Sequence, residues 1–394
     1  MKKIIVLLIL SFILPSQARA IYDPLSVPNN KFGIHIINES DLLMSSALVN
    51  SSGGEWGYVT LVIPENERNI EKWNGIFDQM KKFKLIPIIR IASLLEYDTW
   101  KTPDVNQAEN WAQFLNSLKW YTKNRYIILF NEPNHAKEWG GQVNPRHYAE
   151  IILEYGQKIK NKSSDFFILP SGLDASAPDS SYTMDEVRFL KSITSYKREM
   201  FDILDGWTSH SYPNPHFMGR VNDTGRGTLT TFEWELSLLN QLGIYKKYPV
   251  FITETGWVHN QDNQDSGLYS PDYVAGLIEE AAKSVWNNSK IVAVTPFLLN
   301  YQSYPFAGFS WQKLNSKYYY PQFDSYRSVA KIKGLPELVD SVEVNKSQLT
   351  AGLNISENIQ IEYNLKTANL VMSFFTFLTG KLYPPMRYLT RLIS

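Results

Sequence analysis

The chain alternates between short runs of apolar residues and longer stretches in which apolar residues recur every three or four positions. Eight of the apolar runs have the length and the β-branched content of buried strands. They cover residues 32–37, 57–63, 85–92, 126–131, 166–171, 205–212, 249–254 and 292–299. Amphipathic helical patterns lie between them, most clearly over 65–84 and 106–124. Two further helices are predicted to begin at Pro145 and Pro271, because each proline follows a residue that caps helices well.

Eight strand-then-helix units predict an α/β protein with a (β/α)8 TIM barrel, for which about 250 residues plus insertions is a typical size. A doubly wound open sheet is the alternative, but it usually has a glycine-rich turn after the first strand, and IHIINESD has none. The strand-to-helix connections are long in the second half of the chain, at 213–228, 256–269 and 300–323. Since all such loops lie on one face of a barrel, we expect that face to carry the active site.

The predicted catalytic barrel covers residues 21–335, and two terminal segments flank it. Residues 1–20 combine a basic start, an apolar run and the sequence ARA, which is typical of a signal peptide cleaved after Ala20. We therefore expect a secreted protein, extracellular or periplasmic. Residues 336–394 are predicted to form a C-terminal extension, a small β-rich segment followed by an apolar and basic tail. The apolar run of the tail, residues 370–378, is too short to span a bilayer, so packing on the barrel is favoured over membrane association.

Composition narrows the range of functions. The chain has no cysteine, which excludes disulfides, thiolate catalysis and thiolate metal sites. Its formal charge is 0, and cleavage after Ala20 would remove Lys2, Lys3 and Arg19 and leave about −3, so no basic surplus would recruit nucleic acid. The 11 Trp and 23 Tyr suit both the stacking of sugar rings and the packing of a large core. We expect no cofactor and no metal, and the oligomeric state is left open.

Two of the predicted strands end in a glutamate. Glu132 follows the run YIILFN and Glu254 ends the run VFITE, which are the fourth and seventh strands of the predicted barrel. Both carboxyl groups then face one pocket at the mouth of the barrel. Burying a carboxylate is costly unless a partner holds it there. Glycoside hydrolysis needs such a pair, with one carboxyl protonated to assist the leaving oxygen and the other ionised as nucleophile or base.

The motifs ILFNEPN and FITETGW, together with SHSY on the sixth strand, resemble the retaining glycoside hydrolases of clan A, such as families 5 and 39. The resemblance covers most of the predicted barrel. It implies a secreted enzyme that cleaves a β-linked oligo- or polysaccharide by double displacement, with Glu132 as acid/base and Glu254 as nucleophile. It also implies that Asn131 holds the sugar 2-hydroxyl, that Tyr212 hydrogen-bonds the nucleophile and that His210 contacts the substrate or the carboxylates.

Two features depart from the pattern of the clan. Many members carry an arginine after the second strand, whereas this chain has Arg90 within the third strand, where it is expected to point inward and to have a partner. Members also tend to have a tryptophan after the eighth strand as a floor for the sugar, and here Trp311 or Trp257 is the candidate for that position. His35, on the first strand, is a further candidate for substrate binding. Other candidates left open are Trp139, His135 and Trp207.

Three other functions are alternatives. A non-catalytic carbohydrate-binding barrel usually lacks one of the two glutamates, and this chain has both. A transglycosylase uses the same two glutamates and the same covalent intermediate, so it differs only in the acceptor. A metal-dependent barrel hydrolase is expected to show His-x-His on the first strand, and GIHIIN has a single histidine.

Overall fold

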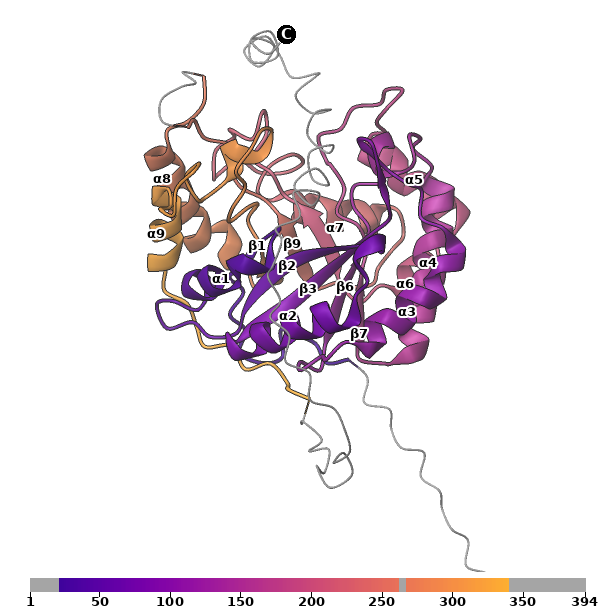
Figure 1. Cartoon of the computed structure of the whole chain (residues 1–394). Coiled ribbons are helices and arrows are strands. Elements are labelled where there is room, and N and C mark those ends of the chain that lie inside the picture. The colour runs from indigo at the N-terminus through magenta and orange to yellow at the C-terminus, as the bar shows by residue number, and fades with distance from the viewer. Residues whose placement is uncertain (1–20, 262–266, 340–394) are drawn as a thin grey trace, which may run out of the picture.

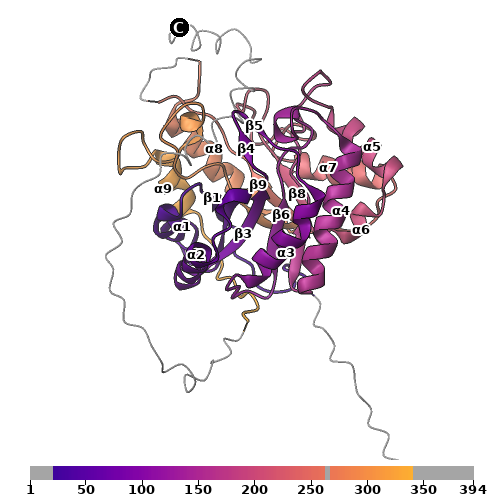
Figure 2. The same ribbon diagram turned by 45° about the vertical axis from the view of Figure 1, so that its right-hand side comes forward.

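The structure is a computed structural model of the 394-residue chain, and it describes residues 21–261 and 267–339. Parallel strands surround a central axis, and helices cover them on the outside (Figures 1 and 2). The strands of the barrel are β1 (Gly33–His35), β2 (Gly57–Pro64), β3 (Leu85–Ala92), β6 (Arg125–Leu129), β7 (Phe166–Leu169), β8 (Trp207–His210), β9 (Val250–Glu254) and β10 (Ile291–Val294). Each lies within or overlaps one of the predicted runs, and the prediction of a (β/α)8 barrel is confirmed.

Each of these strands leads into at least one helix. The helices are α1 (Leu42–Val49), α2 (Ile70–Lys82), α3 (Ala108–Ser117), α4 (Pro145–Lys162), α5 (Glu186–Tyr196), α6 (Met200–Ile203), α7 (Thr231–Gln241), α8 (Pro271–Lys283) and α9 (Pro321–Ser328). Helices α4 and α8 begin at the predicted prolines, and the side chains of Asn144 and Ser270 cap them.

Two parts of the local prediction were wrong. The helix expected over 106–124 ends at Ser117, because Leu118 has an extended backbone. Trp120 and Tyr121 are nevertheless buried, so tertiary packing and not helical periodicity explains their apolar spacing. The loop after β3 also contains a short antiparallel hairpin that was not predicted, formed by β4 (Leu95–Glu96) and β5 (Thr99–Trp100).

The strands form two hydrogen-bonded ladders that meet at two junctions. One ladder has the order β1-β2-β3-β6-β7 and the other the order β10-β9-β8. A parallel bridge between Phe32 and Val294 joins β1 to β10. At the junction of β7 and β8, the Asp205 N–H donates to Ile168 O at 2.8 Å and the Thr208 hydroxyl donates to Pro170 O at 2.7 Å. These contacts close the barrel.

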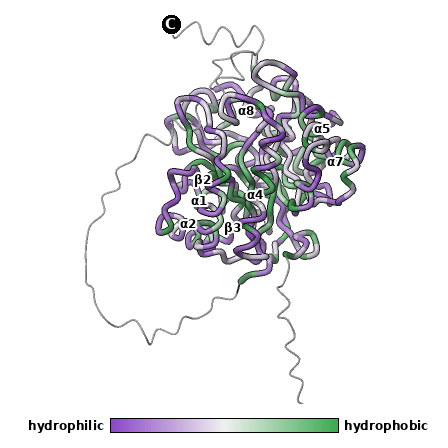
Figure 3. The backbone as a smooth tube through the Cα atoms, turned by 90° about the vertical axis from the view of Figure 1, so that its right-hand side faces the viewer, coloured by the Kyte–Doolittle hydropathy of each residue, from purple (hydrophilic) through white to green (hydrophobic). Residues whose placement is uncertain are grey.

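The strands are buried on both faces, which explains their continuous apolar runs. On β3, Ile86 and Ile88 belong to a cluster that fills the interior of the barrel, whereas Ile89 and Ile91 pack with the core beneath the helices. Figure 3 shows hydrophobic segments running through these strands. Because side chains alternate along a strand, Arg90 shares the inner face with Ile86 and Ile88. Its guanidinium therefore points toward the mouth of the barrel from within, as expected.

The predicted signal peptide and nearly all of the C-terminal extension lie outside the described residues. Cleavage after Ala20, secretion and the boundary at residue 335 stay predictions. In the part of the chain that the structure describes, no helix has the length and apolar character needed to cross a bilayer.

Candidate active site

The long loops predicted in the second half of the chain build the face at which the strands end. Apolar side chains from the loops after β8, β9 and β10 pack together there, among them Tyr212, Val258, Phe297 and Phe309. This packing gives the loops a fixed shape around the carboxyl ends of the strands. The face that carries active sites in other barrels is therefore also the elaborated face of this one.

The two predicted catalytic glutamates meet at the centre of this face. Glu132 lies three residues beyond the end of β6, and Glu254 is the last residue of β9. Their exposed fractions are 3% and 1%. One oxygen of each carboxyl and one ring nitrogen of His210 lie within 4.8 Å of one another. Two carboxylates this close repel each other, so their ionisation must be divided between them or offset by neighbouring charge.

Arg90 and Tyr212 hold Glu254. Arg90 Nη1 donates to Glu254 Oε1 at 2.7 Å and also donates to Asn131 Oδ1, and the Tyr212 hydroxyl donates to Glu254 Oε2 at 3.2 Å. Burial by itself would raise the pKa of Glu254, but the charges of His210 and Arg90 outweigh it and lower the pKa below its usual value. Burial lowers the pKa of His210, which disfavours its charged form. Arg90 is therefore the positive charge that faces Glu254 at neutral pH, where Glu254 is ionised.

Glu132 has the opposite environment. Burial raises its pKa well above the usual value, and the nearby His135 offsets only part of this effect. Its Oε1 atom lies 2.7 Å from His210 Nδ1, and its Oε2 atom has no hydrogen-bond partner among the described residues. Of the two carboxyls, Glu132 is therefore the one whose protonated form is favoured. One of its oxygens is held by His210, and the other is buried and unpaired in the described part of the chain.

The backbone around Glu132 is strained in a way that aims this side chain. Phe130 and Glu132 have φ of +68° and +23°, values that side chains rarely adopt and that persist only where the surroundings enforce them. The Glu132 N–H donates to Gly172 O at 3.1 Å. A Cβ added to Gly172 would lie 2.2 Å from His210 Cδ2, so only glycine leaves room for the imidazole. Gly172 was not predicted, because its role depends on a residue 38 positions later in the chain.

His135, a candidate that the sequence left open, pairs with an acid near Glu132. Its Nε2 atom lies 2.9 Å from Asp174 Oδ2. Burial alone would lower the pKa of His135, but the hydrogen bond and the charge of Asp174 raise it. The imidazole thus supplies positive charge next to Glu132 and moderates the rise of its pKa.

His35, predicted to contact substrate, ends β1 close to the ion pair of Arg90 and Glu254. Its Nδ1 atom has no hydrogen-bond partner in the described part of the chain, and its ring packs edge-on against Phe297 at 5.2 Å. Burial and the charge of Arg90 lower the pKa of His35 to about 3, so the imidazole is neutral.

The two tryptophans considered as a floor for the sugar are both buried. Trp257 is 2% exposed, its indole N–H donates to Gly219 O, and it packs against Trp286 in the core. Trp311 is 3% exposed and packs against Tyr326. Both rings make contacts in the core, and the expectation that one of them forms a floor for the sugar stays a prediction. Trp139 and Trp207, which the sequence left open, are buried in the same core.

Glu132, His210 and Glu254 are also grouped closely enough to offer three ligand atoms to a metal ion. Two observations favour proton transfer over metal binding at this position. Arg90 already places a fixed positive charge 2.7 Å from Glu254. A metal cation bound to Glu254 would lie close to this charge and would be repelled by it. The His210 nitrogen nearest the two carboxyls already contacts Glu132.

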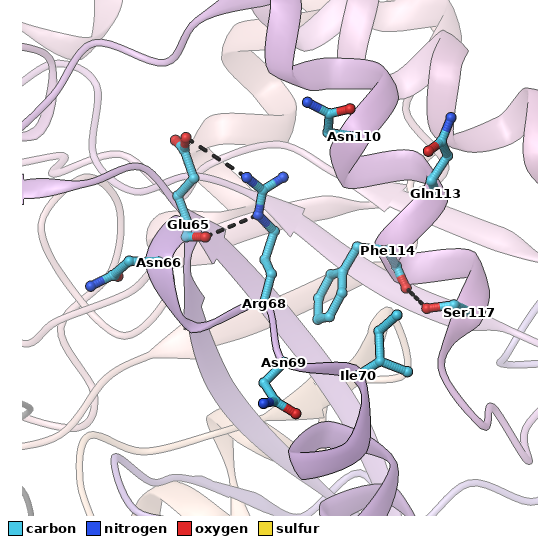
Figure 4. A pocket seen from close by; sticks show the side chains of 9 residues that line it. All are labelled: Glu65, Asn66, Arg68, Asn69, Ile70, Asn110, Gln113, Phe114 and Ser117. Carbon is cyan, nitrogen blue, oxygen red and sulfur yellow. Dashed lines mark hydrogen bonds and ion pairs between the residues drawn. The ribbon is translucent and has the colours of Figure 1, made fainter.

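A separate pocket lies outside the barrel, between the turn that precedes α2 and the side of α3 (Figure 4). Its charged groups satisfy each other, since Arg68 bonds to Glu65 and stacks over Trp111. None of the predicted site residues lines it. Its lining residues are Glu65, Asn66, Arg68, Asn69, Ile70, Asn110, Gln113, Phe114 and Ser117.

Comparison with known proteins bears on the fold. No protein-family model matches the sequence, and no curated protein matches it significantly. Among solved structures, a monomeric beta-xylosidase from Caulobacter crescentus CB15 is similar with a TM-score of 0.50 and 12% identity, over 76% of this chain and 68% of that one. An endo-beta-1,4-glucanase from Xanthomonas axonopodis pv. citri has a TM-score of 0.48 and 13% identity, over 76% and 99% of the two chains. An endo-1,4-beta-mannanase from Rhizomucor miehei has a TM-score of 0.47 and 12% identity, over 77% and 96%. The likeness to the xylosidase shows that the two proteins share a fold, and at 12% identity it assigns no residue a role.

Proposed function

We propose that the protein is a retaining glycoside hydrolase that acts on a β-linked oligo- or polysaccharide. The observation that carries this proposal is the divided pair of carboxyl groups, in which the pKa of Glu132 is raised and the pKa of Glu254 is lowered. One oxygen of each carboxyl lies within 4.8 Å of an oxygen of the other, a nearest-atom distance that is shorter than the separation of the two groups. Retaining enzymes hold their carboxyls about 5–5.5 Å apart, whereas inverting enzymes leave about 6.5–9.5 Å for a water molecule. The short separation supports double displacement.

In the first step, Glu254 attacks the anomeric carbon while Glu132 donates its proton to the leaving glycosidic oxygen. The glycosidic bond breaks and an ester between the sugar and Glu254 forms. In the second step, Glu132, now ionised, removes a proton from water, and the resulting hydroxide attacks the anomeric carbon and releases Glu254. Arg90 and Tyr212 stabilise the Glu254 carboxylate before the first step and after the second, because both donate to its oxygens.

The experiment that tests the proposal separates the roles of the two glutamates. Glu254→Ala should abolish turnover of every aryl β-glycoside, because no covalent intermediate can form. With activated leaving groups, Glu132→Ala should retain the first step and be slow in the second, because water loses its general base. With a natural glycan, the turnover of this variant should fall by about 10²–10⁴-fold. Azide should then restore turnover in Glu132→Ala by attacking the intermediate in place of water, and it should not restore Glu254→Ala.

The matched control is Glu96→Ala, which changes an exposed glutamate on the β4–β5 hairpin and should leave kcat/KM unchanged. Substrates are aryl β-glycosides and β-glucan, xylan and mannan polymers, and proton NMR of the first product should show the β-anomer. If azide restored turnover in Glu254→Ala and not in Glu132→Ala, Glu254 would be the acid/base and Glu132 the nucleophile. Full activity in both variants would remove these residues from the mechanism, and a first product with the α-anomer would make the enzyme inverting.

A further inference from the structure

A small pocket adjoins the carboxylates on the side of the β4–β5 hairpin. The hairpin packs against the turn Ala136–Glu138, which follows Glu132. The Gly140 N–H donates to Trp100 O at 2.8 Å, and Lys137 forms an ion pair with Asp98. Between these two loops lies the pocket, lined by Arg90, Ala92, Ser93, Trp100, Phe130, Asn131 and Glu138. It therefore shares Arg90 and Asn131 with the candidate active site and adds groups from two loops.

Two of the residues that line this pocket each have a buried polar atom with no hydrogen-bond partner among the described residues. The two atoms are Arg90 Nε and Glu138 Oε1. Glu138 is only 5% exposed. Leaving a buried donor or acceptor unpaired is costly, and such groups in folded proteins usually have a water or a ligand as partner. A donor and an acceptor left open in one pocket beside a catalytic pair indicate a place for a group that both accepts and donates.

The charges around the pocket select the kind of group. Arg90 is already neutralised by its ion pair with Glu254, so the pocket has no free cation for a carboxylate or phosphate. Burial raises the pKa of Glu138 well above its usual value, which disfavours the charged form that would attract a cation. A sugar hydroxyl fits both conditions, because it is uncharged and can accept one hydrogen bond while donating another.

We propose, on the basis of the proposed glycosidase function, that Glu138 and Arg90 bind one hydroxyl of the sugar unit whose bond is cleaved. The hydroxyl oxygen accepts from Arg90 Nε–H and donates to Glu138 Oε1. It is a different hydroxyl from the 2-hydroxyl assigned to Asn131, whose amide hydrogen-bonds Glu138. Trp100 closes the pocket with a partly exposed ring. Glu138 is thus a specificity-determining residue, and a sugar that carries a carboxylate or phosphate at this position is rejected.

The test combines changes in the enzyme with changes in the substrate. The wild-type protein, Glu138→Leu and Glu138→Gln are each assayed with the best aryl β-glycoside and with its 3-, 4- and 6-deoxy analogues. For one analogue the wild-type kcat/KM should fall by about 10- to 100-fold, the loss expected for an unpaired buried hydrogen-bonding group. In Glu138→Leu the intact substrate should suffer a similar loss, and the deoxy analogue should be used almost as well as the intact one.

Glu138→Gln retains an acceptor and should keep most of the wild-type discrimination, which guards against a general loss of structure. Glu96→Gln, on the adjoining hairpin, is the control and should behave as wild type. If each deoxy analogue is penalised equally in wild type and Glu138→Leu, Glu138 contacts no hydroxyl and acts only by positioning Asn131 or by binding water, and the inference is wrong while the glycosidase function stands. If the wild-type protein cleaves no glycoside, the function and the inference fall together.

Discussion

At the scale of single residues, two side chains of the same type are given opposite ionisation states by their neighbours. Glu254 accepts from Arg90 and Tyr212, which stabilise its charge. Glu132 is buried with one oxygen unpaired in the described residues, which favours its neutral form. A pair of titratable groups whose pKa values are pushed apart is the usual arrangement of an acid and a nucleophile. The division depends on Arg90 lying on the inner face of β3.

The pH dependence of kcat/KM tests this division. The acid limb reports ionisation of Glu254, so it should lie below pH 4.5, the usual glutamate value, because the pKa of Glu254 is lowered. The alkaline limb reports loss of the proton from Glu132 and should lie well above pH 4.5. Activity is thus lost as the pH falls through the first value and as it rises through the second.

Arg90→Met should move the acid limb to higher pH, since the charge that lowers the pKa of Glu254 is gone. Arg90→Lys keeps that charge and should move the limb less. Both profiles are measured with one aryl β-glycoside. An acid limb that stays in place in Arg90→Met would show that Arg90 does not set the ionisation of Glu254.

At the scale of elements, the sequence predicted what local patterns determine. All eight barrel strands were found because burial on both faces leaves a continuous apolar run, and the starts of α4 and α8 were found because a cap and a proline mark them. The positions of Glu132 and Glu254 followed from the ends of their strands. Gly172 and Glu138 were missed because their importance comes from neighbours in space, and the burial of Trp257 and Trp311 comes from helices packed over them.

The N-terminal cap of α4 allows a test of whether the stability of this helix can be changed without changing the activity of the site. The Asn144 side chain accepts from the His147 N–H at 3.1 Å, and α4 is the helix that follows the Glu132 loop. Asn144→Ala should lower the free energy of unfolding by about 1 kcal/mol and change kcat/KM by less than about twofold. Asn240→Ala, at an exposed position in the last turn of α7, is the control and should not destabilise, since alanine has a higher helix propensity than asparagine. Urea unfolding of the full chain measures both variants, and a loss confined to Asn240→Ala would contradict the assignment of the cap.

At the scale of the whole molecule, the barrel consists of two hydrogen-bonded ladders that meet at two junctions, between β1 and β10 and between β7 and β8. The junction between β7 and β8 lies beside functional residues, since β8 ends at His210 and Gly172 follows β7. Only isolated bonds span this junction in the described chain, whereas β2 and β3 pair along their whole lengths. The strand that carries His210 is therefore held on one side by β9 and on the other by a few contacts. Any loosening of the junction would reach the hydrogen bond between His210 and Glu132 directly.

Thr208→Val tests whether this junction limits the stability of the barrel. Thr208 is fully buried, and its hydroxyl donates to Pro170 O at 2.7 Å across the junction. Valine keeps the shape and removes the donor, so the free energy of unfolding should fall by about 1–3 kcal/mol. Hydrogen exchange should become faster at the amides of β7 and β8 and stay unchanged in β2 and β3, because only this junction is weakened. Thr194→Val, whose hydroxyl bonds within its own helix α5, is the control and should leave exchange in the strands as it is. Equal acceleration in every strand of Thr208→Val would instead show that the barrel opens as a single unit and that the β7–β8 junction has no special weakness.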